Sequence, residues 1–273
     1  MRDPCLLPKR LYLEITGRCN LACPFCRRSA RPIEDLPLTL IEKVMKESRD
    51  ITDYLYLHVQ GEPLLHPQFE QVLRLADEYE RKIQLVTNGL LLAEYQDRLL
   101  ASCCLRKISI SLQGLFLASD LDNKLRALEG FIAEARNKDL IIELRVWSTE
   151  NPEITDYIKT KFGSAIKNGK IRENLYLSCK REFRWPDLSL PLNTERSYCP
   201  GPKLMICILS DGTITPCCLD AAGYIALGNI REQTLSDALL SERYLAMLAG
   251  FRDNKAVEKL CQHCYYLNSY EET

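Results

Sequence analysis

Three cysteines in one short loop are the strongest chemical signal in the sequence. Cys19, Cys23 and Cys26 are separated by three and then by two residues. Thiolates in short loops of this kind hold iron-sulfur clusters. Three ligands for four irons leave one iron open, and an open coordination position is where a catalytic metal binds another molecule. The loop therefore predicts a ligand-binding cluster, with a zinc knuckle or three core cysteines as alternatives.

A second group of four cysteines lies near the C-terminus. Apolar runs at 204–209 and 213–217 flank Ser210-Asp211-Gly212, which is a strong hairpin signal. One cysteine precedes this hairpin, one closes it, and two form a close pair further along the chain. Four thiolates complete the coordination of a cluster. A zinc ribbon is the alternative for these four residues, which are Cys199, Cys217, Cys261 and Cys264.

Two further cysteines compete with this group as ligands. Cys218 is adjacent to Cys217 and is expected on the opposite face of the strand, so that only one of the two points at a given metal. Cys207 lies within the hairpin and is predicted to pack in the core. The remaining cysteines have no partner spacing and are predicted to be core or surface thiols; they are Cys5, Cys103, Cys104 and Cys179.

The segment from Cys19 to Cys26 resembles the Cys-x3-Cys-x-aromatic-Cys signature of the radical S-adenosylmethionine (SAM) superfamily, with Phe25 as the aromatic residue. The resemblance implies that the amino and carboxylate groups of SAM chelate the open iron of a 4Fe-4S cluster. It also implies that one electron, from a donor such as flavodoxin or ferredoxin, splits the sulfonium. The resulting 5'-deoxyadenosyl radical takes a hydrogen atom from the substrate, while the protein supplies geometry and excludes water.

The C-terminal spacing resembles the opening of the SPASM motif of peptide-modifying radical SAM enzymes. No cysteine follows Cys264, so the closer resemblance is to the shortened "twitch" form, which holds one auxiliary 4Fe-4S cluster. The spacing is also similar to that of the 2-deoxy-scyllo-inosamine dehydrogenases of aminoglycoside pathways.

Several residues are candidates for holding SAM. Gln60-Gly61-Glu62-Pro63 resembles the superfamily's GGEP motif, which receives the amino group, and a carboxylate favours an ammonium. Ser111-Leu112-Gln113-Gly114 resembles its Ser-x-Asp-Gly motif, with Gln113 in place of Asp. Arg145, in an apolar strand, is costly to bury alone and is expected to bind either the SAM carboxylate or another buried carboxylate. Thr87 and Asn88 are expected to border the ribose.

Alternating strand and helix patterns are predicted to position these residues. Apolar patterning predicts strands at 11–15, 54–59, 83–86, 108–112, 141–146 and 175–177, with helices between them. Helix starts are indicated by Thr39 with Glu42, by Asn151 with Pro152, and by Thr234. The alternation predicts an α/β fold with a parallel sheet, as an open, partial barrel. The loops after the strands are expected to meet the cysteine loop at the carboxyl edge.

Domain organisation and composition set further limits. The partial barrel is expected over 1–182, a linker over 183–198, and the auxiliary cluster domain over 199–273. Two prolines and weak periodicity in the linker stretch also allow it to be a loop that lines the site. The net charge of −1, from 36 basic and 37 acidic residues, indicates neither a nucleic-acid footprint nor an anionic membrane surface. No apolar run reaches the ~18 residues of a membrane span and no export signal is visible. Thirteen cysteines then suggest metal binding in the cytoplasm.

The predicted function is a radical SAM oxidoreductase whose auxiliary cluster accepts an electron to complete a two-electron oxidation. The substrate is expected to be a small sugar-like alcohol or a residue in a peptide. A peptide-modifying maturase, acting as an epimerase or a crosslinking enzyme, is the alternative. The predicted first strand starts by Leu11 and no leader-peptide recognition domain is visible before it, which weakens this alternative without excluding it. A structural zinc or iron-sulfur protein without enzymatic activity is the third possibility.

Overall fold

The computed structural model describes residues 7–27, 30–147, 151–163, 166, 168–180, 183–193 and 198–266. Contacts within the chain divide it into two compact units. The first unit is formed by Met1–Arg18, Arg27–Gly61 and Phe183–Thr273, and the second by Cys19–Cys26 and Glu62–Glu182. The N-terminal strands therefore share a unit with the C-terminal third of the chain.

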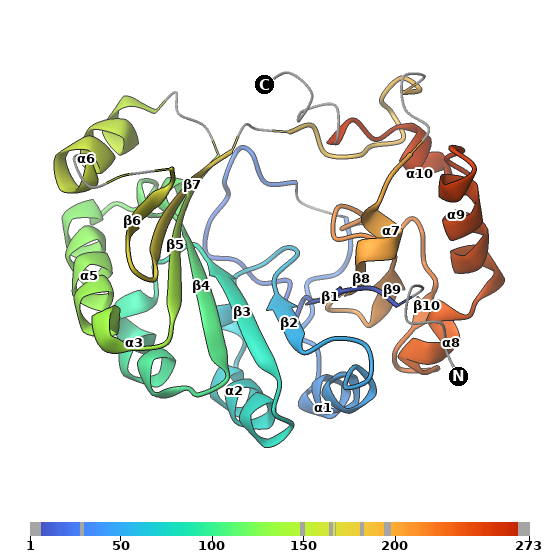
Figure 1. The fold of residues 1–273 in the computed structure, drawn as a ribbon, viewed down its shortest axis with the longest axis horizontal. Coiled ribbons are helices and arrows are strands. Elements are labelled where there is room, and N and C mark those ends of the chain that lie inside the picture. Colours follow the sequence, from blue (N-terminus) through green and yellow to red (C-terminus); the bar gives the residue numbers. More distant parts are fainter. Residues whose placement is uncertain are drawn as a thin grey trace. The chain divides into compact units, whose positions relative to one another are not determined.

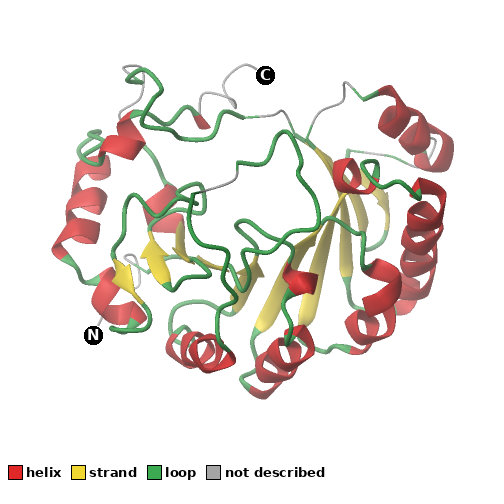
Figure 2. Cartoon of the chain, turned by 180° about the vertical axis from the view of Figure 1, so that it is seen from behind, coloured by secondary structure: helices red, strands yellow, loops and turns green. Residues whose placement is uncertain are grey.

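The second unit is a mainly parallel sheet with helices on its outer face (Figures 1 and 2). Four parallel strands pair in the order β3, β4, β5 and β7, and β6 adds an antiparallel edge. Burial alternates along β3 and β5, because one face of the strands packs on the helices. The strands are β3 (Lys82–Thr87), β4 (Leu105–Ser111), β5 (Ile141–Val146), β6 (Lys170–Arg172) and β7 (Leu175–Cys179). The helices are η2 (Pro63–Leu65), α2 (Phe69–Glu78), α3 (Leu92–Ala101), α4 (Leu112–Leu115), α5 (Leu121–Glu134), η3 (Ala135–Asn137) and α6 (Pro152–Phe162).

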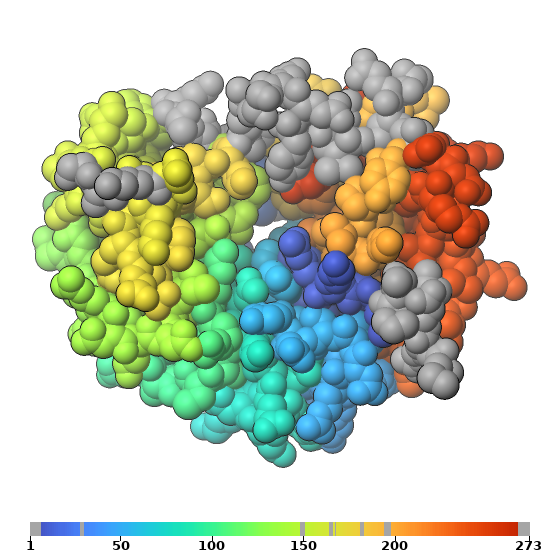
Figure 3. All heavy atoms as spheres, viewed as in Figure 1, coloured from blue at the N-terminus to red at the C-terminus, as the bar shows by residue number. Residues whose placement is uncertain are grey.

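The first unit joins the two ends of the chain through one strand. β1 pairs in parallel with β2 on one side and with β8 on the other, so the C-terminal hairpin continues the N-terminal sheet. In Figure 3 the blue N-terminal residues accordingly lie against the orange C-terminal segment. The strands are β1 (Arg10–Leu13), β2 (Tyr54–Leu57), β8 (Met205–Ile208), β9 (Thr213–Thr215) and β10 (Gly228–Asn229). The helices are α1 (Leu38–Glu47), α7 (Gly201–Leu204), α8 (Leu235–Leu239), α9 (Glu242–Arg252) and α10 (Lys259–Gln262).

Most local signals are confirmed and one is wrong. The side chain of Asn151 accepts hydrogen bonds from the first turn of α6, and Thr234 forms a capping box with Asp237 at α8. The predicted hairpin forms, and Gly212 supplies its positive φ of 87°. The capping box at Thr39 does not form, because α1 starts two residues earlier than predicted and Pro37 is its N-cap.

The fold class is confirmed as an open α/β fold. Both units contain parallel strands, and the strands of neither unit close into a barrel. Among the described residues, no helix is both long enough and apolar enough to cross a bilayer.

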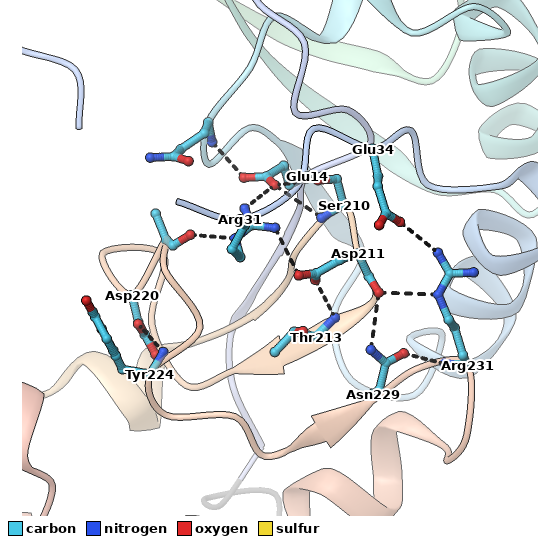
Figure 4. A network of polar contacts seen from close by, with 12 residues as sticks. Glu14, Arg31, Glu34, Ser210, Asp211, Thr213, Asp220, Tyr224, Asn229 and Arg231 are labelled. Carbon is cyan, nitrogen blue, oxygen red and sulfur yellow. Dashed lines mark hydrogen bonds and ion pairs between the residues drawn. The ribbon is translucent and has the colours of Figure 1, made fainter. Parts of the chain in front are cut away.

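A buried ion pair ties the first unit together. Glu14, directly after β1, is 1% exposed, and its carboxylate accepts hydrogen bonds from Arg31 at 2.5 Å and from the backbone N–H and hydroxyl of Ser210 at 3.1 and 2.9 Å. Arg31 also contacts Asp211 at 3.4 Å and the carbonyl of Ala221 at 2.8 Å. Figure 4 shows Arg31 between the two carboxylates, where it links β1 to the C-terminal hairpin.

Replacing Arg31 by methionine is expected to lower the free energy of unfolding by ~3–5 kcal/mol, because the Glu14 carboxylate stays buried without its cation. The double variant Glu14→Gln, Arg31→Met should recover part of this loss. Arg231→Met is the matched control, since it breaks an exposed pair with Glu34 and should cost less than ~1 kcal/mol. Denaturant unfolding of the four proteins checks this, and equal losses for Arg31→Met and Arg231→Met would contradict it.

Candidate active site and auxiliary iron-sulfur site

The three-cysteine loop lies in the second unit, beside the residue that follows β3. Cys19 and Cys26 are exposed and Cys23 is half-buried, and a turn closes with a hydrogen bond from the N–H of Cys26 to the carbonyl of Cys23 at 3.1 Å. The amide of Asn88 donates to Asn20 at 2.7 Å and lies 4.0 Å from the sulfur of Cys19. The predicted meeting of the cysteine loop with the loop after this strand is confirmed.

The carboxylate of Glu62 connects two loops at this edge. It is 1% exposed and accepts hydrogen bonds from the backbone N–H of Leu64 at 3.1 Å and of Asn88 at 2.7 Å. Thr87 is also buried, and its hydroxyl accepts a bond from the N–H of Gly89 at 3.1 Å. Both side chains therefore shape the turns that carry Asn88 and Pro63. Contact of Glu62 with the SAM ammonium, and of Thr87 with the ribose, stay predictions.

The buried carboxyl of Glu62 is expected to make the protein less stable as the pH rises. Burial raises its pKa to about 7, although hydrogen bonds from Asn88, Thr87 and Leu64 oppose the shift. The folded state thus keeps a proton that the unfolded state loses above ~4.3, so this stability is complete below that pH and is lost as the pH rises through 7.

Glu62→Gln should remove this dependence. Between about pH 5.5 and 7.5, the parent should lose ~2 kcal/mol of unfolding free energy more than the variant. Denaturant titrations without added SAM measure the difference, and parallel curves for the two proteins would show that Glu62 does not titrate in this range.

The turn after β4 contains an amide that fits a polar ligand. Both polar atoms of the Gln113 side chain are buried and have no hydrogen-bond partner among the residues that the structure describes. Leaving a buried polar group unpaired costs ~1–3 kcal/mol, so the position suits a molecule that both donates and accepts hydrogen bonds, as SAM does. Ser111 caps α4 by accepting from Gly114, and a Cβ on Gly114 would lie 2.9 Å from that of Asn88. The turns after β3 and β4 are therefore in close contact.

Arg145 lies next to Ser111 in the strand register. Its guanidinium lies over the ring of Trp147 at 4.9 Å and has no hydrogen-bonded or ion-paired acceptor among the described residues. The nearby Glu143 is engaged by Ser109 at 2.6 Å and by Lys107 at 3.1 Å. Arg145 is half-buried, so it remains able to bind the carboxylate of a ligand.

Gln60 and Gly61 belong to the first unit and pack on the segment after β1. The backbone N–H of Gln60 donates to Glu14 at 3.0 Å, and its side chain donates to the carbonyl of Arg27. A Cβ on Gly61 would lie 2.2 Å from the carbonyl oxygen of Thr16, and its φ is +74°. These contacts explain why residue 61 is glycine, since a side chain would clash with Thr16. They also give Gln60, which replaces the first glycine of GGEP, the role of holding this turn against Arg27.

The four C-terminal cysteines all line one cavity of about 260 Å³ in the first unit. In the described part of the chain, no three His, Cys, Asp or Glu side chains are grouped tightly enough for a single metal ion. The thiols instead enclose a space. The N–H of Gly201 donates to the sulfur of Cys199 at 3.3 Å, and the N–H of Leu219 to that of Cys217 at 3.4 Å. Hydrogen bonds to ligand sulfurs are one means by which proteins set cluster potentials.

The electrostatics of this cavity also fit a cluster. Burial raises the pKa of the Cys261 thiol, and the neighbouring thiols of Cys217, Cys199 and Cys264 raise it further. Thiolates crowded in this way need a positive centre, and coordination to a metal deprotonates a thiol outright. A Cβ on Gly201 would come within 3.2 Å of the Cys199 sulfur, so glycine keeps the space beside the thiols open.

The remaining cysteines divide by burial. Cys207 is fully buried with Tyr12 and Leu209, as its packing role predicts. Cys218 lines the same cavity as Cys217, because β9 ends at Thr215 and the two residues lie in a turn. Their expected separation on opposite strand faces is therefore wrong. Cys103 and Cys179 are exposed and Cys104 is buried, as expected of surface and core thiols, and Cys5 lies outside the described residues.

Sequence reasoning missed the residues that cover the auxiliary site. Pro186 and Tyr266 line its cavity, and Asn193 bonds to the carbonyls of Gln262 at 2.7 Å and Cys264 at 2.7 Å. Of the two interpretations of this stretch, a linker or a loop that lines the site, the contacts of Pro186 and Asn193 fit the second. Two prolines and weak periodicity were the sequence signal. The Glu14–Arg31 pair had no signal, since its members and their partners lie far apart in the chain.

Comparison with known proteins agrees with both sites. Residues 13–126 match the radical SAM superfamily, and residues 199–265 match SPASM, an iron-sulfur cluster-binding domain. The chain is 29% identical to the tungsten-containing aldehyde ferredoxin oxidoreductase cofactor-modifying protein of Pyrococcus furiosus, over 86% of this chain and 82% of that protein. It is 20% identical to the S-adenosyl-L-methionine-dependent 2-deoxy-scyllo-inosamine dehydrogenase of Niallia circulans, over 93% and 91% of the two chains. The sporulation killing factor maturation protein SkfB of Bacillus subtilis is 22% identical, over 93% and 70%.

Solved structures share the fold. BtrN in complex with AdoMet and 2-DOIA aligns with a TM-score of 0.62 at 17% identity, covering 97% of this chain and 94% of that one. Streptococcus suis SuiB bound to the precursor peptide SuiA aligns with a TM-score of 0.67 at 16% identity, covering 98% and 74%. Residues 13–126 therefore belong to a radical SAM domain, which binds a 4Fe-4S cluster and SAM, and residues 199–265 belong to a SPASM domain, which binds an auxiliary iron-sulfur cluster.

Proposed function

We propose that the protein is a radical SAM oxidoreductase that carries out a two-electron oxidation. SAM bound at the first cluster supplies a 5'-deoxyadenosyl radical, which abstracts a hydrogen atom from the substrate. We assign Cys19, Cys23 and Cys26 to the SAM-binding cluster. The other residues that we assign to SAM binding are Phe25, Gln60, Gly61, Glu62, Pro63, Thr87, Asn88, Ser111, Gln113 and Arg145.

The observation that carries the proposal is the single cavity that Cys199, Cys217, Cys261 and Cys264 line together. Four thiols leave no ligand position for substrate on a single cubane, which suits an electron acceptor better than a binding site. Loss of a hydrogen atom and then of an electron and a proton oxidises an alcohol to a carbonyl. We infer that the auxiliary cluster domain, of the twitch or SPASM type, begins at Cys199, after the partial barrel and its linker.

A polar sheet face in the second unit favours a small hydroxylated substrate. Lys107, Ser109 and Ser111 alternate along one face of β4, and Glu143 lies on the same face of β5 with Arg145. The Glu143 carboxylate contacts the hydroxyl of Ser109 at 2.6 Å and the ammonium of Lys107 at 3.1 Å. These side chains could donate and accept hydrogen bonds with the hydroxyl groups of a substrate. They precede Ser111 and Arg145, which we assign to SAM, along the same strands.

A peptide-modifying maturase is the second candidate function, supported by the likeness to SkfB. The two candidates differ in product. A dehydrogenase removes two hydrogens from a small alcohol. An epimerase leaves the peptide mass unchanged in ordinary water, but in deuterated water it exchanges one hydrogen for deuterium and raises the mass. Mass spectrometry of candidate alcohols and peptides in deuterated buffer separates them. A cytoplasmic location and a flavodoxin or ferredoxin donor complete the proposal.

The direct test is anaerobic reconstitution with iron and sulfide, followed by dithionite and SAM. The protein should bind about eight irons, four for each cubane, and should release 5'-deoxyadenosine only when dithionite is present. Absence of 5'-deoxyadenosine from a preparation with full iron content would overturn the enzymatic proposal. A content of about four irons, or zinc in the C-terminal site, would overturn the auxiliary cluster assignment.

A further inference from the structure

A second cavity lies beside the auxiliary site, on the outside of the first unit. Its volume is about 540 Å³, and it lies between α7 and α9, which are side by side in Figure 1. Tyr198 and Leu245 line it and are 49% and 41% exposed. The cavity therefore opens at a surface that presents apolar side chains.

Cys199 connects this outer cavity with the auxiliary site. It lines both the 260 Å³ cavity enclosed by the four thiols and the outer cavity. Phe251 likewise lines both. A group seated in the outer cavity is therefore separated from the auxiliary site only by the side chains that form the common wall. Electron transfer to or from the auxiliary site requires a redox partner to approach it this closely.

The charges at the outer cavity have one sign. Lys203 and Arg252 line it, and none of the described lining residues carries a carboxylate. The neighbouring Asp253 pairs with Arg252 at 3.4 Å, but both side chains are more than two thirds exposed, so the pair is weak. An apolar centre with a basic rim is complementary to an acidic protein surface with an apolar middle.

We propose that this cavity is the docking site for an acidic ferredoxin, which takes electrons out of the enzyme through the Cys199 wall. The inference rests on the proposed function. Each substrate radical that loses one electron and one proton leaves one electron on the auxiliary cluster. Transfer of that electron to an oxidised ferredoxin restores the cluster and yields one reduced ferredoxin per turnover. Electron-transfer complexes are small and transient, which fits a cavity of this size.

The test measures binding and electron transfer with an oxidised, acidic plant-type ferredoxin. Lys203→Glu, Arg252→Glu reverses the rim, and Lys138→Glu, Lys159→Glu is the matched control, with the same charge change on exposed side chains of the second unit. Calorimetric titration of the holoenzyme at low salt should show at least ~10-fold weaker binding for the rim variant and little change for the control. Salt should weaken parent binding and flatten this difference.

A second measurement ties docking to the cluster. The dithionite-reduced holoenzyme, freed of dithionite, should reduce ferredoxin at least ~10-fold more slowly in the rim variant. Its oxidation by ferricyanide, a small oxidant, should be unchanged. Equal ferredoxin affinities in parent and rim variant, equal weakening in both variants, or no binding by the parent would overturn the proposal. A rim variant that changes the oligomeric state of the enzyme alone would instead identify a second copy as the occupant.

The two proposals fail separately. Release of 5'-deoxyadenosine with dithionite needs no ferredoxin, so the rim variant should retain it at the parent's rate. If the parent releases none, the oxidoreductase proposal fails whatever ferredoxin does.

Discussion

Cys23→Ala should abolish 5'-deoxyadenosine formation and remove half of the iron. In the assignment we propose, the SAM-binding cluster has three protein ligands, so loss of one would leave two and expose the cluster to solvent. Loss of an outer-sphere partner alone costs ~10–100-fold in metal affinity or activity, and loss of a ligand should exceed this. We expect activity to fall by more than ~100-fold and iron to fall from about eight atoms to about four.

The matched control for this variant is Cys103→Ala. Cys103 is exposed and lies just before β4, so its thiol should be dispensable. Anaerobic chromatography of 5'-deoxyadenosine and colorimetric iron analysis are the measurements. Unchanged activity in Cys23→Ala, or the same loss in Cys103→Ala, would show that this loop does not hold the cluster. The four auxiliary thiols are not altered by either substitution, so their iron should remain in both proteins.

Cys217→Ala should have the complementary effect. It removes one of the four thiols around the auxiliary cavity, so about four irons should be lost, while 5'-deoxyadenosine continues to form at the intact first cluster. Oxidised product should disappear, because the substrate radical has no electron acceptor. The radical then returns to substrate by regaining hydrogen, and 5'-deoxyadenosine accumulates without matching product. Product yield per 5'-deoxyadenosine is therefore the informative ratio.

Cys218→Ala is the control that tests the choice between adjacent cysteines. Both thiols line the cavity. The pKa of the Cys217 thiol is raised, mainly by a hydrogen bond with Cys218 and also by burial. If Cys217 is the ligand, Cys218→Ala should keep its full iron content. If Cys218→Ala loses iron and Cys217→Ala retains it, Cys218 is the cluster ligand and Cys217 is not. Electron paramagnetic resonance of the reduced proteins gives the same answer without any substrate.

The sequence by itself determined the spacing of the three cysteines in the first loop and the order of strands and helices. Cys19, Cys23 and Cys26 lie within eight residues, so their spacing limits where they lie in space. The capping residues Asn151 and Thr234 act on backbone groups within three residues, and the Asp211-Gly212 turn is equally local. Such features depend on near neighbours and survive in any fold that contains them.

Only the tertiary structure decided how distant segments combine. Pairing of β1 with β8, the Glu14–Arg31 pair, and the fixing of Asn193 against Cys264 join residues with no common local pattern. Cys217 and Cys218 face one cavity because β9 ends two residues earlier, which alternation along a longer strand could not reveal. Burial of charge and the closing of a cavity depend on packing from all sides, so they are properties of the folded chain and not of any short stretch of it.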